Sequence, residues 1–132
     1  MARFDKARDE VKRWEFYWAD LNFPVGSEQG GDRRPVLVVS NDGFNAASTL
    51  VTVLPLTKLE GKKRKVYAHE VLLEEEVVNT GFASIVMPQQ IRTISKDRLL
   101  ERITALHDPD KQEEIVNRLL EHLDIEFEAE AP

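Results

Sequence analysis

The segment from Gly26 to Asn41 gathers the residue types that bind an anion. Its glycines leave backbone N–H groups accessible, and it also carries a carboxylate, an amide and two arginines. Arg34 comes just before the apolar run Val36-Leu37-Val38-Val39, which is typical of a strand buried on both faces. A guanidinium fixed at the base of such a strand can hold a phosphate through two parallel hydrogen bonds. The segment therefore predicts either an anion site or an ordinary flexible hairpin loop.

A second group of cations follows a predicted strand. It consists of Lys58, Lys62, Lys63, Arg64 and Lys65. Such a loop can neutralise the phosphates of a nucleic-acid backbone. The same composition also fits a solvated loop without a ligand, and both interpretations stay open at this point.

Other kinds of active site find less support. The three histidines, His69, His107 and His122, are scattered, and none has a second His or Cys at metal-ligand spacing. The run Glu74-Glu75-Glu76 is more typical of a solvated loop than of a cation site. The chain has no cysteine, no Gly-rich nucleotide-binding motif and no nucleophile-elbow motif. Metal-dependent and nucleotide-dependent enzymes are therefore less favoured, and no cofactor is expected.

The acidity of the chain is concentrated near its end. The net charge is −6, but the segment from Glu101 onward holds ten acids and three bases, whereas the first 100 residues hold 14 acids and 15 bases. A locally basic site on the main domain is compatible with this distribution, although the whole chain would steer RNA only weakly.

The length and composition are typical of one soluble globular domain, with 132 residues, 42% hydrophobic and 32% charged. The N-terminal stretch from Met1 to Lys12 is charged, unlike a secretory signal. No apolar run approaches the roughly 20 residues needed to cross a bilayer. We expect a cytoplasmic protein that does not contact the membrane.

Periodicity and turn residues predict a mainly β domain that also contains helix. The expected strands are Trp14 to Leu21, Pro35 to Ser40, Leu50 to Leu56, Val66 to Leu73, Ala83 to Ile94 and Leu100 to Leu106. A loop is expected from Asn22 to Arg33, turns at Asn41-Asp42-Gly43 and Asn79-Thr80-Gly81, and one helical turn from Ser95 to Leu99. Pro88 predicts a bend, a bulge or an edge within its strand.

A C-terminal helix is predicted to begin at Asp108-Pro109, because a capping residue precedes a proline at the first helical position. Ile115, Leu119 and Leu123 give it one apolar face that is expected to pack on the sheet. A short helix is also expected from Ala2 to Arg13. The predicted organisation is an N-terminal extension (1–12), a largely antiparallel barrel domain (13–125) and a frayed acidic tail (126–132).

One long segment and three short ones resemble a known family. The run Gly26-Ser27-Glu28-Gln29-Gly30-Gly31, then Arg34-Pro35-Val36-Leu37-Val38-Val39-Ser40-Asn41, resembles the signature of the MazF/PemK family of toxin endoribonucleases. Three further segments follow in the family's order: Arg13 to Leu21, Val51 to Thr57, and Gln90-Ile91-Arg92-Thr93-Ile94. The resemblance covers roughly Arg13 to Leu123. The family more often has Gly-Asp at Trp14-Glu15, so Trp14 is expected to cover the barrel or to widen a dimer contact.

The resemblance implies a small antiparallel SH3-like barrel of the CcdB/Kid/MazF type, with five or six strands, a C-terminal helix and a homodimeric assembly. It also implies sequence-selective cleavage of single-stranded RNA without a metal. The substrate's own 2′-OH would attack, giving a 2′,3′-cyclic phosphate and a 5′-OH. The implied partner is a MazE-like antitoxin whose disordered segment folds along the RNA groove.

By position, the resemblance implies that Arg34 and Thr57 are catalytic and that Glu28 supports activity. The RNA-binding residues are expected to be Ser27, Gln29, Lys58, Gln90 and Arg92. A guanidinium and a hydroxyl would stabilise the negative charge of the phosphorane. Arg34 is the expected donor to the leaving oxygen. The proton acceptor is either Arg34 or Glu28, since a free arginine has a pKa above about 12 and is a poor base.

Two other functions fit the same barrel. One is a non-cleaving relative that binds RNA or an antitoxin as a regulator, and the other is a gyrase poison like CcdB. At the level of single residues, the alternatives are an Arg34 that merely pairs with Asp32 or Glu28, and a Thr57 that is an ordinary strand-end residue.

Overall fold

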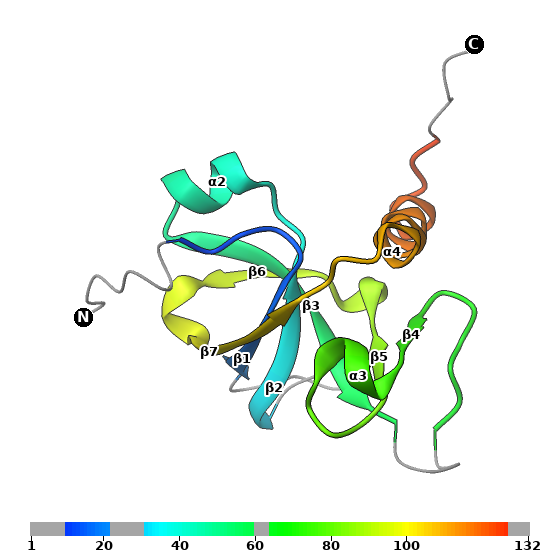
Figure 1. Ribbon diagram of the computed structural model, residues 1–132. Coiled ribbons are helices and arrows are strands. Elements are labelled where there is room, and N and C mark those ends of the chain that lie inside the picture. The colour runs from blue at the N-terminus through cyan, green and yellow to red at the C-terminus, as the bar shows by residue number, and fades with distance from the viewer. Residues whose placement is uncertain (1–9, 22–30, 60–63, 127–132) are drawn as a thin grey trace.

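A computed structural model of the protein describes residues 10–21, 31–59 and 64–126. Within them, seven antiparallel strands form one curled sheet, in the order β4-β5-β3-β2-β1-β7 with β6 also paired to β3 (Figure 1). The strands are β1 Glu15–Leu21, β2 Gly31–Val38, β3 Leu50–Lys58, β4 Val71–Leu73, β5 Ser84–Val86, β6 Arg92–Ser95 and β7 Leu99–Ala105. The helices are α2 Asp42–Ala47, α3 Glu75–Val78 and α4 Pro109–His122, with 3-10 turns η1 Pro88–Gln90 and η2 Lys96–Arg98.

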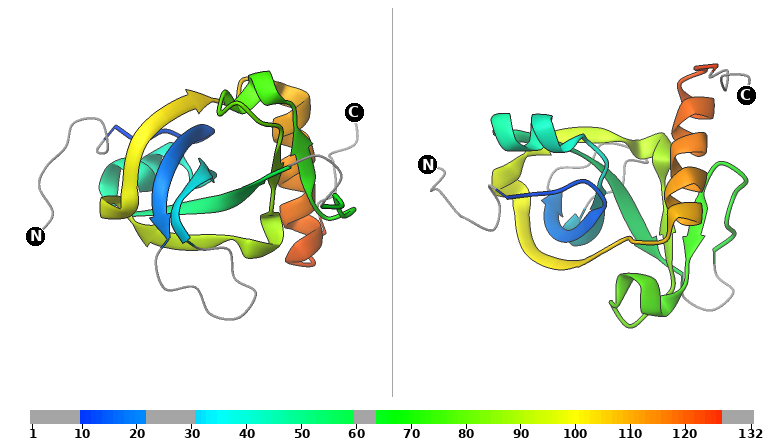
Figure 2. Two further views of the ribbon diagram at one scale, coloured as in Figure 1. Left: turned by 90° about the horizontal axis from the view of Figure 1, so that it is seen from below. Right: turned by 45° about the horizontal axis from the view of Figure 1, so that its top comes forward.

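Strand β3 organises the sheet because it is long enough to serve two partners along one edge. Its first part, Leu50 to Val53, pairs with β6, and its last part, Leu56 to Lys58, pairs with β5. Its other edge pairs with β2. The β2 residues Val36, Leu37 and Val38 are fully buried, as predicted for a strand covered on both faces. The sheet that contains β3 is curled (Figure 2). Apolar side chains of β3 belong to both core clusters, so both faces of the strand are covered.

Helix α4 packs on one side of the curled sheet (Figure 2). It begins as predicted, because the Asp108 side chain accepts a hydrogen bond from the backbone N–H of Asp110. Ile115 is fully buried and Leu119 packs against the same core. Leu123 is 53% exposed, so the predicted apolar face ends one turn earlier than the sequence spacing implies. In the described part of the chain, no helix has the length and apolar character needed to cross a membrane.

Two predicted strands are shorter than expected. Of the stretch from Val66 to Leu73, only Val71–Leu73 is a strand. The single strand predicted from Ala83 to Ile94 is instead three elements, β5, η1 and β6. The strand is interrupted at Pro88, where a bend, a bulge or an edge was predicted. Proline cannot donate to the ladder and its fixed φ suits the first position of a helical turn, which is where Pro88 lies.

Local side-chain hydrogen bonds explain another correction. The predicted turn at Asn41-Asp42-Gly43 is instead the start of α2, because the Asn41 side chain accepts from the backbone N–H of Phe44. The short helix α3 was not predicted at all. Strand β2 begins at Gly31, inside the predicted loop, and ends at Val38. Most of the predicted N-terminal helix and of the acidic tail lies outside the described residues.

Trp14 packs against the core of the barrel, which fits the expectation that it covers the barrel, and the alternative of a wider dimer contact stays a prediction. Its backbone N–H donates to the carbonyl of Val38 at the end of β2, and its own carbonyl accepts from the N–H of Leu106, the residue directly after β7. The Trp14 side chain packs against the core that α4 also covers, and the Arg13 guanidinium lies 4.6 Å from its ring.

Candidate active site

Arg34 lies in β2 at the point where the buried part of that strand begins. It pairs with Ala19 of β1, and the three buried residues that follow closely fix the register of the strand. The Arg34 side chain is half-buried. The sequence prediction of an arginine positioned at the base of a buried strand is therefore correct.

Thr57 and Lys58 end β3, where they pair with Ile85 and Ser84 of β5. Thr57 is half-buried and Lys58 is exposed. On the other edge of β3, the pairing with β2 ends at Val36 and Pro55. Continuing that register by two residues brings Thr57 level with Arg34 along the strands.

A pocket of about 310 Å³ opens where the paired part of β2 and β3 ends. It is lined by Trp18, Arg33, Arg34, Pro35, Leu56, Lys58, Thr80, Phe82 and Ser84. The structure therefore brings together Arg34 and Lys58, which the sequence analysis had singled out separately. Thr57 is not part of this lining, because alternation along β3 puts Leu56 and Lys58 on one face and Thr57 on the other, which is the face that Thr57 shares with Arg34 by register.

Two cations of the pocket each lie beside an aromatic ring. The guanidinium carbon of Arg33 lies 5.9 Å from the ring centroid of Trp18, and the Lys58 ammonium lies 4.1 Å from that of Phe82. Cations over aromatic faces are attracted by the negative charge of the π face. The resulting walls combine positive charge with flat apolar surface, which suits a ligand that has both phosphates and rings.

Of the nine lining residues, the sequence analysis predicted only Arg34 and Lys58 as site residues; those that it missed include Trp18, Arg33, Thr80, Phe82 and Ser84. Phe82 could have been recognised from the sequence as a candidate site residue, because it directly follows the predicted turn at Asn79-Thr80-Gly81, where a large apolar residue is unexpected. Trp18 carried no such signal, because an aromatic residue inside a predicted strand is ordinary core material.

The remaining predicted residues fall elsewhere. Gln90 lies in η1, where its amide nitrogen is 3.9 Å from the Met87 sulfur, and Arg92 pairs with Val53 in the middle part of β3. Neither lines the pocket. Ser27, Glu28 and Gln29 lie outside the described residues, so their roles stay predictions.

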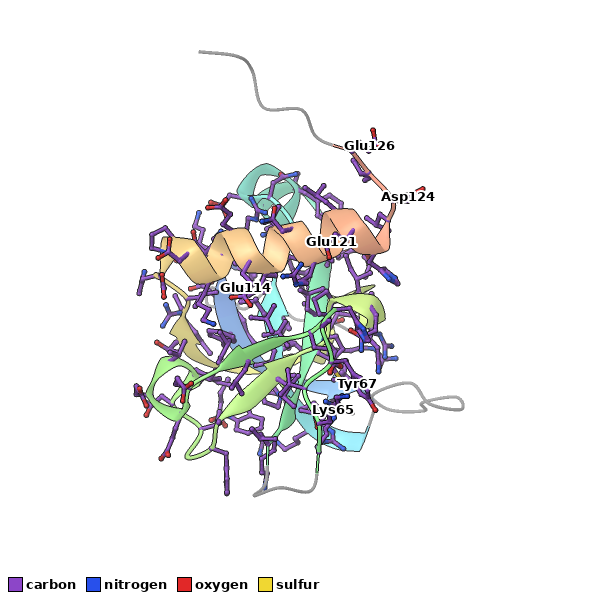
Figure 3. All side chains as sticks on the ribbon, turned by 90° about the vertical axis from the view of Figure 1, so that its right-hand side faces the viewer. Lys65, Tyr67, Glu114, Glu121, Asp124 and Glu126 are labelled. Carbon is purple, nitrogen blue, oxygen red and sulfur yellow. The ribbon has the colours of Figure 1, made fainter. Side chains whose placement is uncertain are left out.

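A second cluster, made of Arg64, Tyr67 and Gln89, surrounds Glu70, whose side chain is fully buried. Both guanidinium NH2 groups of Arg64 donate to the Glu70 carboxylate at 2.9 Å, and the Gln89 amide donates at 2.8 Å. The backbone N–H of Tyr67 supplies a fourth donor at 3.2 Å. Arg64, which the sequence analysis grouped with the basic loop, is thus engaged in a structural ion pair with Glu70. Lys65, by contrast, is exposed beside Tyr67 (Figure 3).

The two charges of this cluster stabilise each other. Burial alone would raise the pKa of Glu70, but the hydrogen bonds from Arg64, Gln89 and Tyr67 outweigh it and hold that pKa below its ordinary value. The hydrogen bond to Glu70 raises the pKa of Arg64 against the opposing effect of burial. The pair is therefore charged on both sides and anchors the segment before β4 to η1.

The curled barrel, its C-terminal helix and a cationic pocket at the base of β2 define the class to which the chain belongs. Residues 12–123 match the family described as PemK-like, MazF-like toxin of type II toxin-antitoxin systems. The chain belongs to this family. The family prediction is confirmed, as is that of a mainly β fold with a C-terminal helix, although the sheet has seven strands rather than five or six.

Individual relatives narrow the comparison. Endoribonuclease EndoA of Bacillus subtilis (strain 168) is 44% identical over 100 residues, which are 74% of this chain and 82% of that protein. MazF (Form-I) from Deinococcus radiodurans has a TM-score of 0.73 at 26% identity, covering 87% of this chain and 97% of that one. A mycobacterial endoribonuclease in complex with its cognate antitoxin has a TM-score of 0.69 at 20% identity over 90% and 98% of the two chains, a likeness of fold alone. The expectation of an endoribonuclease is confirmed at the level of the family and its named relatives.

Proposed function

We propose that this protein is a toxin endoribonuclease that cleaves single-stranded RNA without a metal ion, at selected sequences. The observation that carries the proposal is the position of Arg34 on the wall of a pocket that also contains Lys58 and two aromatic rings. Membership of the MazF-like toxin family and 44% identity to an endoribonuclease support it independently of this geometry.

The proposed reaction is attack of an RNA 2′-OH on the adjacent phosphate. The new P–O bond forms as the bond to the 5′-oxygen of the next nucleotide breaks, so the products are a 2′,3′-cyclic phosphate and a 5′-OH. The phosphorane carries more negative charge than the ground state. A guanidinium aimed at it therefore lowers the barrier, because the interaction strengthens as the charge develops.

Arg34 is the residue proposed to hold the phosphorane, since its planar fork matches two phosphate oxygens at once. It also protonates the leaving 5′-oxygen in this mechanism. Thr57, level with Arg34 along the strands, adds a hydroxyl donor to the same phosphate. The proton of the 2′-OH goes to Glu28 or to Arg34, and the low basicity of a guanidinium favours the carboxylate.

The proposed partners follow from the same family. A MazE-like antitoxin is proposed to neutralise the toxin by laying a disordered segment along the RNA-binding groove, and toxin–antitoxin complexes exist among the structural relatives. A homodimer acting in the cytoplasm completes the proposal. Gln90 and Arg92, which lie away from the pocket, are proposed RNA contacts on the remainder of the groove.

The decisive experiment incubates a long RNA with the protein in excess EDTA and maps the cleaved ends. Wild-type protein is expected to cleave and to leave 5′-OH ends, whereas Arg34→Ala and Thr57→Ala are expected to lose most of that activity. Cleavage that depends on added magnesium, or that survives both substitutions, would contradict the mechanism. RNA binding without any cleavage would instead favour the regulator interpretation.

A further inference from the structure

Two aromatic side chains from distant parts of the chain, Trp18 of β1 and Phe82 of the loop before β5, line the pocket that contains Arg34. Phe82 is 43% exposed, and the Lys58 ammonium lies over its ring. We propose that this pocket binds one unstacked RNA base, with Trp18 and Phe82 as its walls, beside the phosphate held at Arg34. The inference rests on the proposed function and identifies part of its sequence selectivity.

Stacking is the first physical reason. Proteins that bind single-stranded RNA hold splayed bases against aromatic rings and arginine planes, and they place cations along the backbone. The pocket has both parts, since Arg33 lies 5.9 Å from the Trp18 ring and Lys58 lies 4.1 Å from the Phe82 ring. An exposed cation–π contact is weaker than base–aromatic stacking. A base can therefore displace the flexible Lys58 ammonium from the ring and leave it beside the neighbouring phosphate.

The polar groups of the pocket give the second reason. Two hydroxyl residues, Thr80 and Ser84, lie among its apolar walls, and Ser84 is only 2% exposed. Hydroxyls can donate to or accept from the edge of a base, and a few polar groups in an otherwise apolar pocket fix orientation and specificity. A volume of about 310 Å³ is at the small end of ligand pockets, which suits one nucleoside rather than a duplex.

The first test measures binding separately from cleavage. The probe is a fluorescent, random-sequence pool of short 2′-O-methyl RNA, which lacks the nucleophilic hydroxyl and cannot be cleaved by the proposed reaction. Phe82→Ala is expected to weaken binding by about 10-fold to 100-fold, while Phe82→Tyr keeps the ring and binds like wild type. The salt dependence should stay the same in Phe82→Ala, because no phosphate contact is lost.

Tyr67→Ala is the matched control. Tyr67 is 50% exposed and lies between Arg64 and Lys65, at 5.9 and 5.8 Å, but it is outside the pocket. Its removal is expected to change the affinity by less than about twofold, because it supplies no stacking wall. Equal losses in Phe82→Ala and Tyr67→Ala, or an unchanged affinity in Phe82→Ala, would overturn the base pocket.

The second test separates the failure of this inference from the failure of the proposed function. Sequencing of the 5′-OH ends left by each protein in EDTA is expected to show that Phe82→Ala loses the base preference at one position beside the cut. An unaltered preference at every position would count against the pocket. If wild-type protein cleaves nothing, the proposed function fails, and the binding comparison still decides whether the pocket holds a base.

Discussion

Two arginines, Arg33 and Arg64, occupy similar positions beside an aromatic ring but have very different acidic partners. Arg33 lies 5.9 Å from the Trp18 ring and Arg64 lies 5.9 Å from the Tyr67 ring. Arg64 donates two 2.9 Å hydrogen bonds to a fully buried carboxylate. Arg33 has a 3.5 Å contact with Glu101, and the Arg33 and Glu101 side chains are 54% and 78% exposed.

The burial of the acidic partner decides what each arginine can do. A buried carboxylate has no water to replace its donors, so the ion pair around Glu70 must stay closed. An exposed pair is screened by solvent and contributes little, so Arg33 can turn to an incoming phosphate at small cost. The comparison predicts that substitutions in the pocket alter RNA chemistry, whereas substitutions around Glu70 alter the stability of the fold.

The largest expected effect is that of Arg34→Ala on RNA cleavage. Loss of one charge-stabilising donor costs about 100-fold to 1,000-fold in rate. Arg34→Lys should also be strongly impaired, because an ammonium cannot make two parallel bonds to a phosphate. Single-turnover cleavage at saturating protein measures the rate, with Arg64→Ala, assayed well below its melting temperature, as the control that stays close to wild type. A comparable rate loss in Arg34→Ala and Arg64→Ala would contradict the proposed difference between the pocket and the ion pair at Glu70.

Next in size is the effect of Glu70→Gln on stability. The four donors around Glu70 require two oxygen acceptors, and an amide replaces one of them with a further donor facing Arg64 or Gln89. The free energy of unfolding should fall by about 3 kcal/mol, at the lower end for a broken buried pair because Arg64 is partly exposed. Urea titration measures this. Glu101→Gln, the matched exposed acid, should change it by less than about 1 kcal/mol.

The pH dependence of stability gives a smaller effect from the same cluster. The pKa of Glu70 is lowered in the folded protein from its ordinary value of 4.5. Its contribution is therefore fully present above that unfolded-state value and is lost as the pH falls through the lower folded-state value. Below about pH 5, wild-type stability should decline more steeply than that of Glu70→Gln. If the free energy of unfolding fell equally steeply with pH in both proteins, Glu70 would not be the source of this pH dependence.

The smallest expected effect is that of Glu101→Gln on RNA binding. Removing a negative charge 3.5 Å from Arg33 should strengthen the binding of single-stranded RNA by a few-fold at low salt. Lys58→Ala should act in the opposite direction and lower the salt slope by about 0.7, as expected for one lost contact to a single-strand phosphate. Fluorescence anisotropy across a salt series checks both, and an effect of Glu101→Gln that persists at high salt would argue against a simple charge effect.

Local patterns in the sequence were enough to predict much of the scaffold. The strands β1, β3 and β7, the cap of α4 and the bend at Pro88 all follow from periodicity and from residues with a fixed local preference. The length of β4 was overestimated because residues 66–68 are apolar, as in a strand, whereas Glu70 accepts hydrogen bonds from Arg64, Tyr67 and Gln89. The bond from Gln89 comes from 19 residues away, and a local pattern does not contain such a contact.

The sequence alone determined the mainly β fold with its terminal helix, the family resemblance, and the importance of Arg34 at the base of a buried strand. It also singled out Lys58 without saying where that side chain would lie. Only the tertiary structure decided that Trp18, Arg33 and Phe82 would join Arg34 and Lys58 around one pocket, and that Thr57 and Arg92 would lie outside it. The physical reason is that strand pairing and the separation of β2 from β3 set these distances, and neither is encoded by the spacing of residues along the chain.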